Sequence, residues 1–489
     1  MAYVGAATSL AQHGRMRVPT AKWDRADSTS SLSLWPPGLP VAIAVPVFLG
    51  ASPIQSARWI NVLAAAATAA AIVLLIAGPV GYAAGVIGVL VVFATQAVFD
   101  TQISVLSEPL FIALLLLLLA AMIHARDGLL RLGVLSTAVV MVRYAGAAAP
   151  LAVVLWTLSD SRHDMRTRVR RAITVAVIPF LAIVSWFART AMAPDRHATP
   201  KLKFYGGWGA TLAQARDTFG EWLAPLLPDG TVQRCIALFV GIVIVAFIVA
   251  AANDTSGKRL RRMRVSGVNT LLSAASLLGA CYVLVVLASR AFVGGTIPLD
   301  WRILAPLIVL VEVSIVAAIG YWWRAYHFPT RAAIALAAAT WLGAAATVSV
   351  NDAVYAATEG SDFAGSDWRD SPLTLWVHDH AAGHRLYSNW PPALYFHAHR
   401  IARELPDTTR PQDVVPFGKQ LRKDHGYIVA YDEQSPDFIS PETLVRVIGL
   451  HRVVRTSDGA VWSADSVAAT DSVSHDSVAT AKAALPHQG

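Results

Sequence analysis

A long series of apolar segments between residues 41 and 350 constrains the fold of this chain more than any other feature. A helix of roughly 20 apolar residues crosses a bilayer, and backbone groups in lipid must be bonded within helices or closed barrels. Of all residues, 55% are hydrophobic and 15% are charged, against about 25% charged in soluble domains. We therefore expect an all-α polytopic membrane protein, with about ten spans judged by segment length.

Regions of different composition flank these apolar segments. Residues 1–40 are polar and interrupted by prolines, so we expect an extracytoplasmic loop, followed by a transmembrane module at residues 41–350. Residues 351–464 have the composition of a soluble domain. Residues 465–489 repeat Asp-Ser-Val and are expected to be a disordered tail.

The soluble region is expected to be a small extracytoplasmic α/β domain. Residues 385–388 and 427–431 are typical of strands, because apolar, aromatic and β-branched residues dominate them. Residues 392–404 begin with proline and are typical of a helix, since proline is tolerated in the first turn.

Basic residues indicate the orientation in the membrane. They gather in two loops, at residues 162–171 and 258–264, with Arg324 and Arg331 in a third. Such loops stay in the cytoplasm, so the net charge of +8 indicates topology and not a nucleic-acid partner. Counting spans from these loops places the chain after residue 351 outside, in a multi-pass protein of the plasma membrane.

An arginine interrupts the apolar segment at residues 132–156. Its length of about 25 residues fits either one span or two short half-spans that turn at residues 143–146. Only the hairpin places residues 100–108 and residues 1–40 outside. We favour the hairpin, because an arginine within a span is costly in lipid and usually marks a cavity.

Glu108 and Asp100 are acidic residues at the edge of the membrane region. A partly desolvated carboxylate at such a position can deprotonate or orient an acceptor hydroxyl, which gives both residues a candidate catalytic role. Alternatively, both are solvated loop charges, with Glu108 in the first turn of a helix, where the helix dipole favours an acid.

Arg143 is the strongest candidate for a binding residue, because a guanidinium can hold a phosphate through two hydrogen bonds. The alternative is a buried ion pair with Glu312, which also lies deep within its apolar segment. Arg302 lies beside Asp300 and Trp301, and it is either a second phosphate ligand or an interfacial anchor.

The remaining charged candidates lie in loops. Lys201 and Lys203 either cover a bound lipid headgroup or rest on the membrane surface. No metal site is expected, since both cysteines lie in apolar segments and the histidines at residues 378–384 lack a zinc spacing. A divalent cation is the one cofactor left open.

Several short motifs follow one another along nearly the whole chain. They are Tyr3-Val4-Gly5-Ala6-Ala7, Trp35-Pro36-Pro37-Gly38, Ser107-Glu108-Pro109-Leu110-Phe111, Arg143-Tyr144-Ala145-Gly146, Asp300-Trp301-Arg302-Ile303-Leu304-Ala305-Pro306 and Tyr387-Ser388-Asn389-Trp390-Pro391. Their order resembles that of the GT-C membrane glycosyltransferases. The most similar branch is that of the prokaryotic protein O-mannosyltransferases and aminoarabinose transferases.

This resemblance implies a conserved seven-helix module and a sugar donor carried on polyprenyl phosphate. It supports a catalytic role for Glu108 and assigns Trp35, Tyr144 and Asp300 to substrate binding. In the family a catalytic Asp shortly precedes the aromatic residue matched by Tyr3, and this chain has neither that Asp nor the first transmembrane helix. We expect upstream sequence to encode one apolar span of roughly 20 residues followed by an Asp.

Together these observations predict a glycosyltransferase of the hexosyl or pentosyl type. It would move a sugar from a polyprenyl-phosphate donor to a hydroxyl of a glycan, lipid or protein acceptor at the outer face of the membrane. Glu108 would position or deprotonate the acceptor, while Arg143 and Arg302 would hold the donor phosphate. Two alternatives stay open: a transporter or flippase for a lipid-linked saccharide, and a catalytically inactive GT-C-like subunit.

Overall fold

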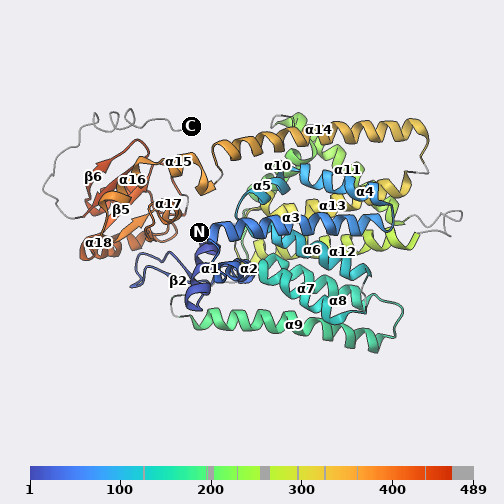
Figure 1. Cartoon of the computed structure of the whole chain (residues 1–489), viewed down its shortest axis with the longest axis horizontal. Helices are drawn as coiled ribbons and strands as arrows, with labels where there is room; N and C mark the ends of the chain where they lie inside the picture. Colours follow the sequence, from blue (N-terminus) through green and yellow to red (C-terminus); the bar gives the residue numbers. More distant parts are fainter. Residues whose placement is uncertain are drawn as a thin grey trace. The chain divides into compact units, whose positions relative to one another are not determined.

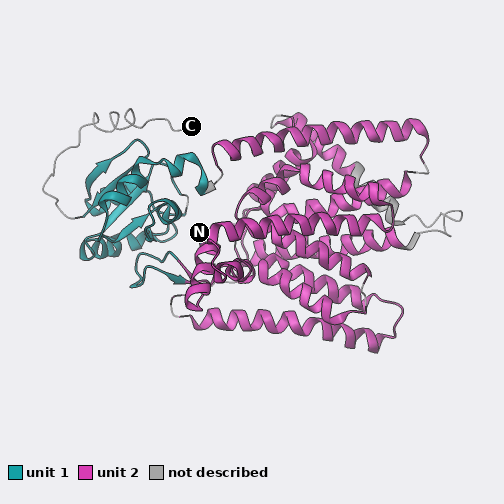
Figure 2. Cartoon of the chain, viewed as in Figure 1, with its two compact units in different colours: residues 1, 19–30, 363–489 teal, residues 2–18, 31–362 magenta. Residues whose placement is uncertain are grey.

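The computed structural model describes the chain from residue 1 to 464, except residues 125–126, 194, 196–202, 228–229, 254–264, 295–296, 324–325, 361 and 436. The chain divides into two compact units (Figure 2). The helical unit comprises residues 2–18 and 31–362, and the α/β unit comprises residues 1, 19–30 and 363–489. The predicted disordered tail lies outside the described residues.

Helices form nearly all of the helical unit (Figure 1). They are α1 (Ala2–His13), α2 (Gly38–Phe48), α3 (Pro53–Ala77), α4 (Tyr82–Ala94), α5 (Gln96–Ile103), α6 (Glu108–His124), α7 (Leu129–Val142), the 3-10 helix η1 (Tyr144–Ala147), α8 (Ala148–Leu158), α9 (Met165–Met192), α10 (Trp208–Leu223), α11 (Thr231–Asn253), α12 (Val265–Phe292), α13 (Trp301–Trp322) and α14 (Phe328–Thr358). Two short strands, β1 (Arg17–Val18) and β2 (Ser30–Ser31), pair with each other. Local sequence fixes several helix starts: Ser52 Oγ accepts from Gln55 N at 3.3 Å, and Pro53 begins α3.

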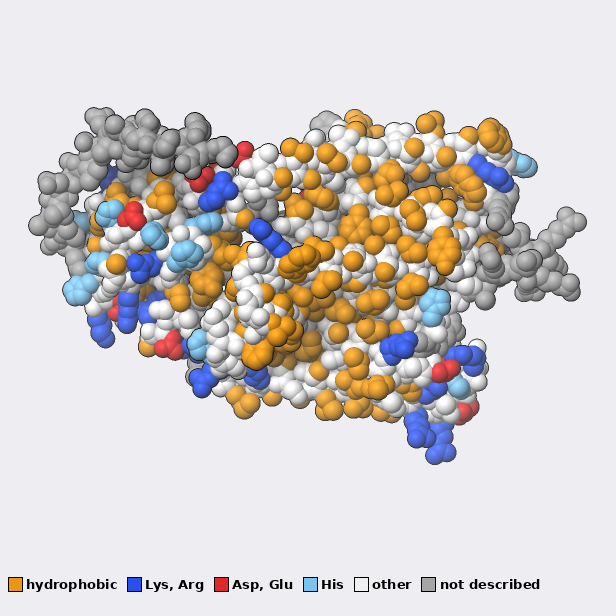
Figure 3. Space-filling model, in the orientation of Figure 1, with side chains coloured by type: hydrophobic (Ala, Val, Ile, Leu, Met, Phe, Trp, Pro, Cys, Tyr) orange, Lys and Arg blue, Asp and Glu red, His pale blue; other side chains and the backbone are white. Residues whose placement is uncertain are grey.

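Among the described helices, α3, α9, α12, α13 and α14 are long and apolar enough to cross a membrane. A sixth span would combine α4 and α5, which meet at an angle of 72°. Hydrophobic side chains cover much of the visible surface of this unit, as a lipid environment requires (Figure 3). The predicted helical membrane fold with a small sheet-containing unit is confirmed, while the count of about ten spans stays a prediction.

The apolar segment at residues 132–156 is broken at Arg143, as predicted. Helix α7 ends just before this residue, whose backbone is extended (φ −146°, ψ 141°), and η1 leads into α8. The turn needs the glycine of the motif, because a Cβ on Gly146 would lie 2.6 Å from Val139 O.

The chain reverses direction at this break. Arg143 contacts Glu108 at the start of α6, whereas Trp156 Nε1 of α8 donates to Met122 O, near the end of α6, at 3.0 Å. Helices α7 and α8 therefore form a hairpin. Each arm of 14 or 11 residues spans roughly 16–21 Å, which is shorter than a hydrocarbon core of about 30 Å.

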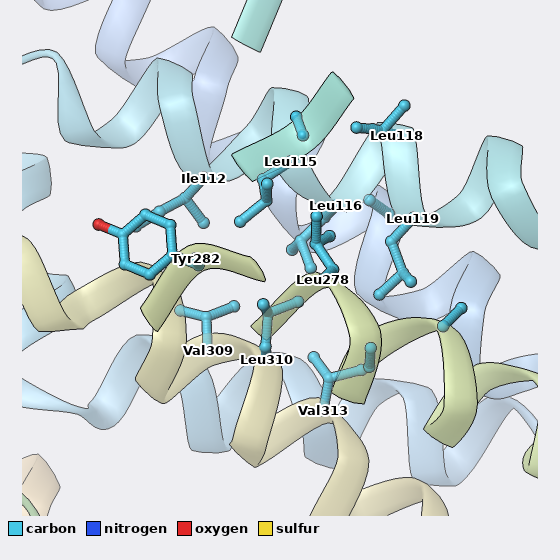
Figure 4. Packing of buried hydrophobic residues seen from close by; sticks show 14 of the residues in the cluster. Ile112, Leu115, Leu116, Leu118, Leu119, Leu278, Tyr282, Val309, Leu310 and Val313 are labelled. Carbon is cyan, nitrogen blue, oxygen red and sulfur yellow. The ribbon is translucent and has the colours of Figure 1, made fainter. Parts of the chain in front are cut away.

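The core of the helical unit lies among α6, α12 and α13 (Figure 4). Leu116 of α6, Leu278 and Tyr282 of α12 and Leu310 of α13 are all buried in it. Helix α6 is apolar around its whole circumference, so it packs inside the bundle. This packing carries its first residue, Glu108, into the interior.

The α/β unit contains a five-stranded sheet of order β4-β3-β5-β7-β6. Strands β4, β3 and β5 are parallel, while β7 and β6 are antiparallel. The elements after α14 are η2 (Asp362–Ala364), α15 (Ser366–Arg369), α16 (Pro372–His380), β3 (Leu386–Ser388), α17 (Pro391–His397), β4 (Ala402–Glu404), η3 (Pro411–Asp413), α18 (Val414–Lys423), β5 (Tyr427–Tyr431), α19 (Pro441–Ile448), β6 (His451–Arg455) and β7 (Gly459–Ser463).

The two predicted strands of this unit are confirmed as β3 and β5. The predicted helix at residues 392–404 is wrong in its second half. Helix α17 ends at His397, because His399 adopts a positive φ of 51° that a right-handed helix excludes, and β4 follows.

Residues 19–30 belong to the α/β unit although they lie near the N-terminus. Glu404 N donates to Ala21 O at 3.0 Å, so this segment lies along the edge strand β4. Trp23 then packs edge-on against Phe417 of α18, with ring centroids 5.8 Å apart. The segment thereby covers a sheet edge that would otherwise expose unpaired backbone groups.

Candidate active site

Glu108 is the centre of a group of charged side chains at one end of the helical unit. Its side chain is fully buried, with 0% exposure. Oε1 forms one ion pair with Arg143 Nη1 and another with Arg302 Nε at 3.0 Å. Ser107 Oγ donates to Oε2 at 3.3 Å and accepts from Arg143 Nη1 at 3.3 Å. We call these four residues the Glu108 cluster.

Three elements that are far apart in sequence supply the Glu108 cluster: the start of α6, the break after α7 and the first turn of α13. Arg143 lies where the helix has stopped, so its side chain is free to reach α6. Arg302 is aimed by the start of α13, where Asp300 Oδ1 accepts from Ile303 N at 3.1 Å. Asp300 is therefore a helix cap, and its predicted role in substrate binding stays a prediction.

The two arginines differ in access to solvent. The Arg143 side chain is 14% exposed, whereas that of Arg302 is 42% exposed. Only Nε of Arg302 bonds within the described part of the chain, which leaves its Nη1 and Nη2 available to a ligand. Two guanidinium groups on one carboxylate give the cluster a net positive charge, so the ligand it favours is an anion.

Aromatic residues from the first motifs adjoin the Glu108 cluster. The Tyr3 hydroxyl donates to Ser107 Oγ at 3.4 Å, and burial raises the pKa of Tyr3, so the hydroxyl keeps its proton. The Trp35 ring lies edge-on to Tyr3 at 6.2 Å and is 37% exposed. The structure thus brings the predicted residue Trp35 into the neighbourhood of Glu108.

Tyr144 connects the hairpin to α9. Its hydroxyl accepts from Trp186 Nε1 at 2.9 Å, and its ring stacks on Phe187 with centroids 5.7 Å apart. These contacts fix the turn that carries Arg143. A direct role of Tyr144 in substrate binding stays a prediction.

The other predicted residues take different positions. Asp100 is half-buried on α5. The exposed Lys203 places Nζ over the Tyr205 ring at 4.8 Å, and its N donates to Phe292 O at 3.2 Å. Lys201 lies outside the described residues. Their roles stay predictions.

The alternative prediction, an ion pair between Arg143 and Glu312, is wrong. Glu312 is bonded to Thr95 and to Trp222 Nε1, the latter at 2.8 Å, and it makes no ion pair within the described residues. Arg143 reaches Glu108 because the chain reverses at the break and brings the guanidinium back to the start of α6. Arg143 does form a buried ion pair, but its partner is Glu108.

A divalent cation does not fit the Glu108 cluster. Both arginines already occupy Oε1, and a metal ion would be repelled by the net positive charge. Among the described residues, no group of three or more His, Cys, Asp or Glu side chains is arranged to hold a metal ion.

Sequence reasoning missed two supporting residues. Ser107 links Tyr3, Arg143 and Glu108 through hydrogen bonds. The sequence pointed to it only through its position directly before Glu108 in their shared motif. Tyr282 donates to Ile303 O at 2.7 Å and ties α12 to the first turn of α13. A single tyrosine in an apolar segment was its only signal.

No family model and no curated protein matches this sequence. The chain is similar to solved structures of ArnT from Cupriavidus metallidurans, in the apo state and bound to undecaprenyl phosphate. The identity is 13%, the TM-score 0.46, and 95–96% of this chain and 93–94% of that chain are covered. It is also similar to the arabinofuranosyltransferase AftD from Mycobacteria, with the same identity and TM-score, over 95% of this chain and 39% of that one. At this identity and TM-score, the similarities assign no activity to the chain.

Proposed function

We propose that this chain is a membrane glycosyltransferase that moves a sugar from a polyprenyl-phosphate donor to a hydroxyl acceptor. One observation carries the proposal: two guanidinium groups converge on a buried carboxylate at one end of an apolar helical bundle. A lipid-linked phosphate needs cationic ligands next to an apolar environment, and an acceptor hydroxyl needs a hydrogen-bond acceptor nearby.

The position of the basic loops supports a reaction at the outer face. Helix α6 spans 17 residues, which is roughly 25 Å, and the Glu108 cluster lies at its start. The loop after its other end carries Asp127, which pairs with Arg171 of the basic segment at 2.7 Å. If that basic end is cytoplasmic, the Glu108 cluster faces the outside of the plasma membrane.

The geometry supports a division of roles. Arg302, with two unused nitrogens, would hold the donor phosphate, while the buried Arg143 would keep the site positively charged. Glu108 would orient the acceptor hydroxyl through Oε2, whose single bond to Ser107 is long. The bond between sugar C1 and the phosphate oxygen breaks, the acceptor oxygen bonds to C1, and its proton passes to Glu108 or to the released phosphate.

Sugar transfer by the purified full chain tests this proposal. Polyprenyl-phosphate sugars with radiolabelled hexose or pentose are supplied with a glycan, lipid or protein acceptor, and label in the acceptor is counted. Wild type should transfer label, and Glu108→Gln should not. If label only crosses the bilayer of proteoliposomes, the transporter reading holds. If neither transfer nor crossing occurs with any donor, the inactive-subunit reading holds.

A further inference from the structure

Glu312 is a buried acid that the proposed reaction does not use. It lies near the middle of α13 and is 2% exposed. Oε1 is bonded to the Thr95 hydroxyl and accepts from Trp222 Nε1 at 2.8 Å, while Oε2 has no partner among the described residues. No Arg, Lys or His of the described chain pairs with it. Since an isolated buried carboxylate is strongly disfavoured, this environment selects the uncharged acid.

The two partners of Glu312 belong to separate segments. Thr95 lies at the bend of 72° between α4 and α5. Trp222 lies near the end of α10, and its carbonyl accepts from Trp341 Nε1 of α14 at 3.1 Å. A single carboxyl group therefore joins α13 to the bend and to α10, and through α10 to α14.

The bend at Thr95 leads directly to the Glu108 cluster. Helix α5 begins after Thr95, and its far end is held by Asn61 Nδ2, which donates to Gln102 O at 3.3 Å and to Ser104 O at 2.6 Å. The chain then continues to Ser107 and Glu108. Helix α5 is thus held at its end by Asn61 and at its start by Glu312, together with two bonds to α14, from Ser349 Oγ to Ala94 O and from Gln96 Nε2 to Asp352 Oδ2.

We propose that Glu312 is an uncharged positioning residue that fixes the bend at Thr95 and thereby places Ser107 and Glu108. The inference rests on the proposed function for its effect on sugar transfer, but its effect on the bend is independent of any activity. Small displacements at a reacting centre are costly, because a shift of about 1 Å can lower a rate by roughly a hundredfold.

The bend can be measured directly in the full chain. Tyr82 at the start of α4 and Ile103 at the end of α5 are both exposed and accept spin labels through Tyr82→Cys and Ile103→Cys. The native Cys235 and Cys281 are first replaced by serine and alanine. Pulsed EPR then reports the distance between the labels across the bend.

Glu312→Gln keeps an acceptor for Trp222 and the uncharged state. Its label distance and pH–rate profile should therefore match those of wild type, and its rate of sugar transfer should lie within about twofold of the wild-type rate. Glu312→Leu removes both bonds and should broaden the distance and lower kcat by about tenfold to a hundredfold. If Glu312→Leu does not fold, Thr95→Val replaces it in the test, and it should also broaden the label distance and lower kcat. Ser314→Ala is the matched control, because the one bond of Ser314 Oγ to the described residues goes to Leu310 O of its own helix.

The outcomes separate the two claims. A wild-type label distance in Glu312→Leu and Thr95→Val would overturn the positioning role. Equal impairment of Glu312→Gln and Glu312→Leu, or a changed pH profile in Glu312→Gln, would also overturn it, since the charged form would then be required. If wild type transfers no sugar, the proposed function fails, while the EPR distances still decide the role of Glu312 at the bend.

Discussion

Each unit of this protein holds a buried carboxylate side chain between two arginines, and the two sites differ in how the carboxylate oxygens are bonded. In the α/β unit Asp424 pairs with Arg385 at 2.8 Å and with the buried Arg403 at 3.5 Å. In the helical unit Glu108 pairs with Arg143 and Arg302. The chemical groups are nearly the same.

Both carboxylate oxygens of Asp424 accept hydrogen bonds of 3.0 Å or less. Oδ1 accepts from Arg385, while Oδ2 accepts from Tyr387 at 2.6 Å and from Gln420 at 3.0 Å. Glu108 instead binds both arginines through one oxygen, and its second oxygen has only the long bond from Ser107. A carboxylate with short bonds at both oxygens stabilises its fold, whereas one with a weakly bonded oxygen can also bind a substrate group.

The largest expected effect is on activity. Glu108→Gln removes the charge but keeps the shape, and it should lower the rate of sugar transfer by about 10²–10⁴-fold, the usual contribution of a positioned acid or base. Asp424→Asn is the matched change in the other unit and should leave the transfer rate of folded protein near wild type. Equal losses in both variants, measured per folded molecule, would contradict the difference between the two sites.

The next largest effect is on stability. Asp424→Ala leaves the buried Arg403 without its carboxylate and should destabilise the α/β unit by about 3–5 kcal/mol. Hydrogen exchange of β3 and β5 peptides in the full chain measures this change. Arg385 is 47% exposed, so Arg385→Ala should cost less than about 1 kcal/mol. Similar exchange in both variants would argue against a closed structural site around Asp424.

A smaller effect is expected from changing Arg302, the more exposed arginine of the Glu108 cluster. Arg302→Lys keeps the charge but loses the planar fork, so kcat/KM for the donor should fall by about tenfold. Because Arg302 is partly exposed, folding should be unaffected. Steady-state kinetics with varied donor concentration checks this, and Arg216→Lys, another partly exposed arginine, serves as the control. Unchanged donor kinetics in Arg302→Lys would remove its assigned role.

The smallest effect is a pH dependence in the α/β unit. Burial acts to raise the pKa of Asp424, but hydrogen bonds from Tyr387, Gln420 and Arg385 hold that pKa below its usual value. The folded-state pKa is therefore lower than the unfolded one, so this stability is complete above about pH 4 and is lost as pH falls through the folded value. Proteolysis of the full chain at pH 7 and at lower pH should show the loss in wild type and less of it in Asp424→Asn. An equal change in proteolysis rate with pH in wild type and Asp424→Asn would contradict the assignment of this pH dependence to Asp424.

Much of the helical unit was predictable because hydropathy and helix length are properties of single segments. The break at Arg143 followed from the cost of an arginine in an apolar helix. The structure brings Glu108, Arg143 and Arg302 together, while the roles that their motifs suggested stay predictions. The partner of Arg143 was not predictable, because Glu108 and Glu312 are equally plausible until the direction of the hairpin is known.

Other features depend on tertiary contacts that leave no local pattern. The bend at Thr95 lies inside an apolar run that satisfies the pattern of a continuous span. Bonds from distant helices distinguish it, namely Thr95 to Glu312 and Ser349 Oγ to Ala94 O. Residues 19–30 are too polar and irregular to be recognised as part of a distant sheet, yet they cover the edge of β4. A local sequence pattern predicts which face of an element is apolar, but the element that packs against that face is determined by the whole fold.

The position of a bound donor tests the central claim most directly. A cryo-EM structure of the full chain with a non-transferable polyprenyl-phosphate sugar analogue should place a phosphate oxygen within about 2.7–3.2 Å of an Arg302 Nη atom. The sugar C1 should then lie on the side of the Glu108 carboxyl that carries Oε2. A phosphate bound elsewhere, with the Glu108 cluster unchanged and unoccupied, would contradict the assignment of this cluster as the site of transfer.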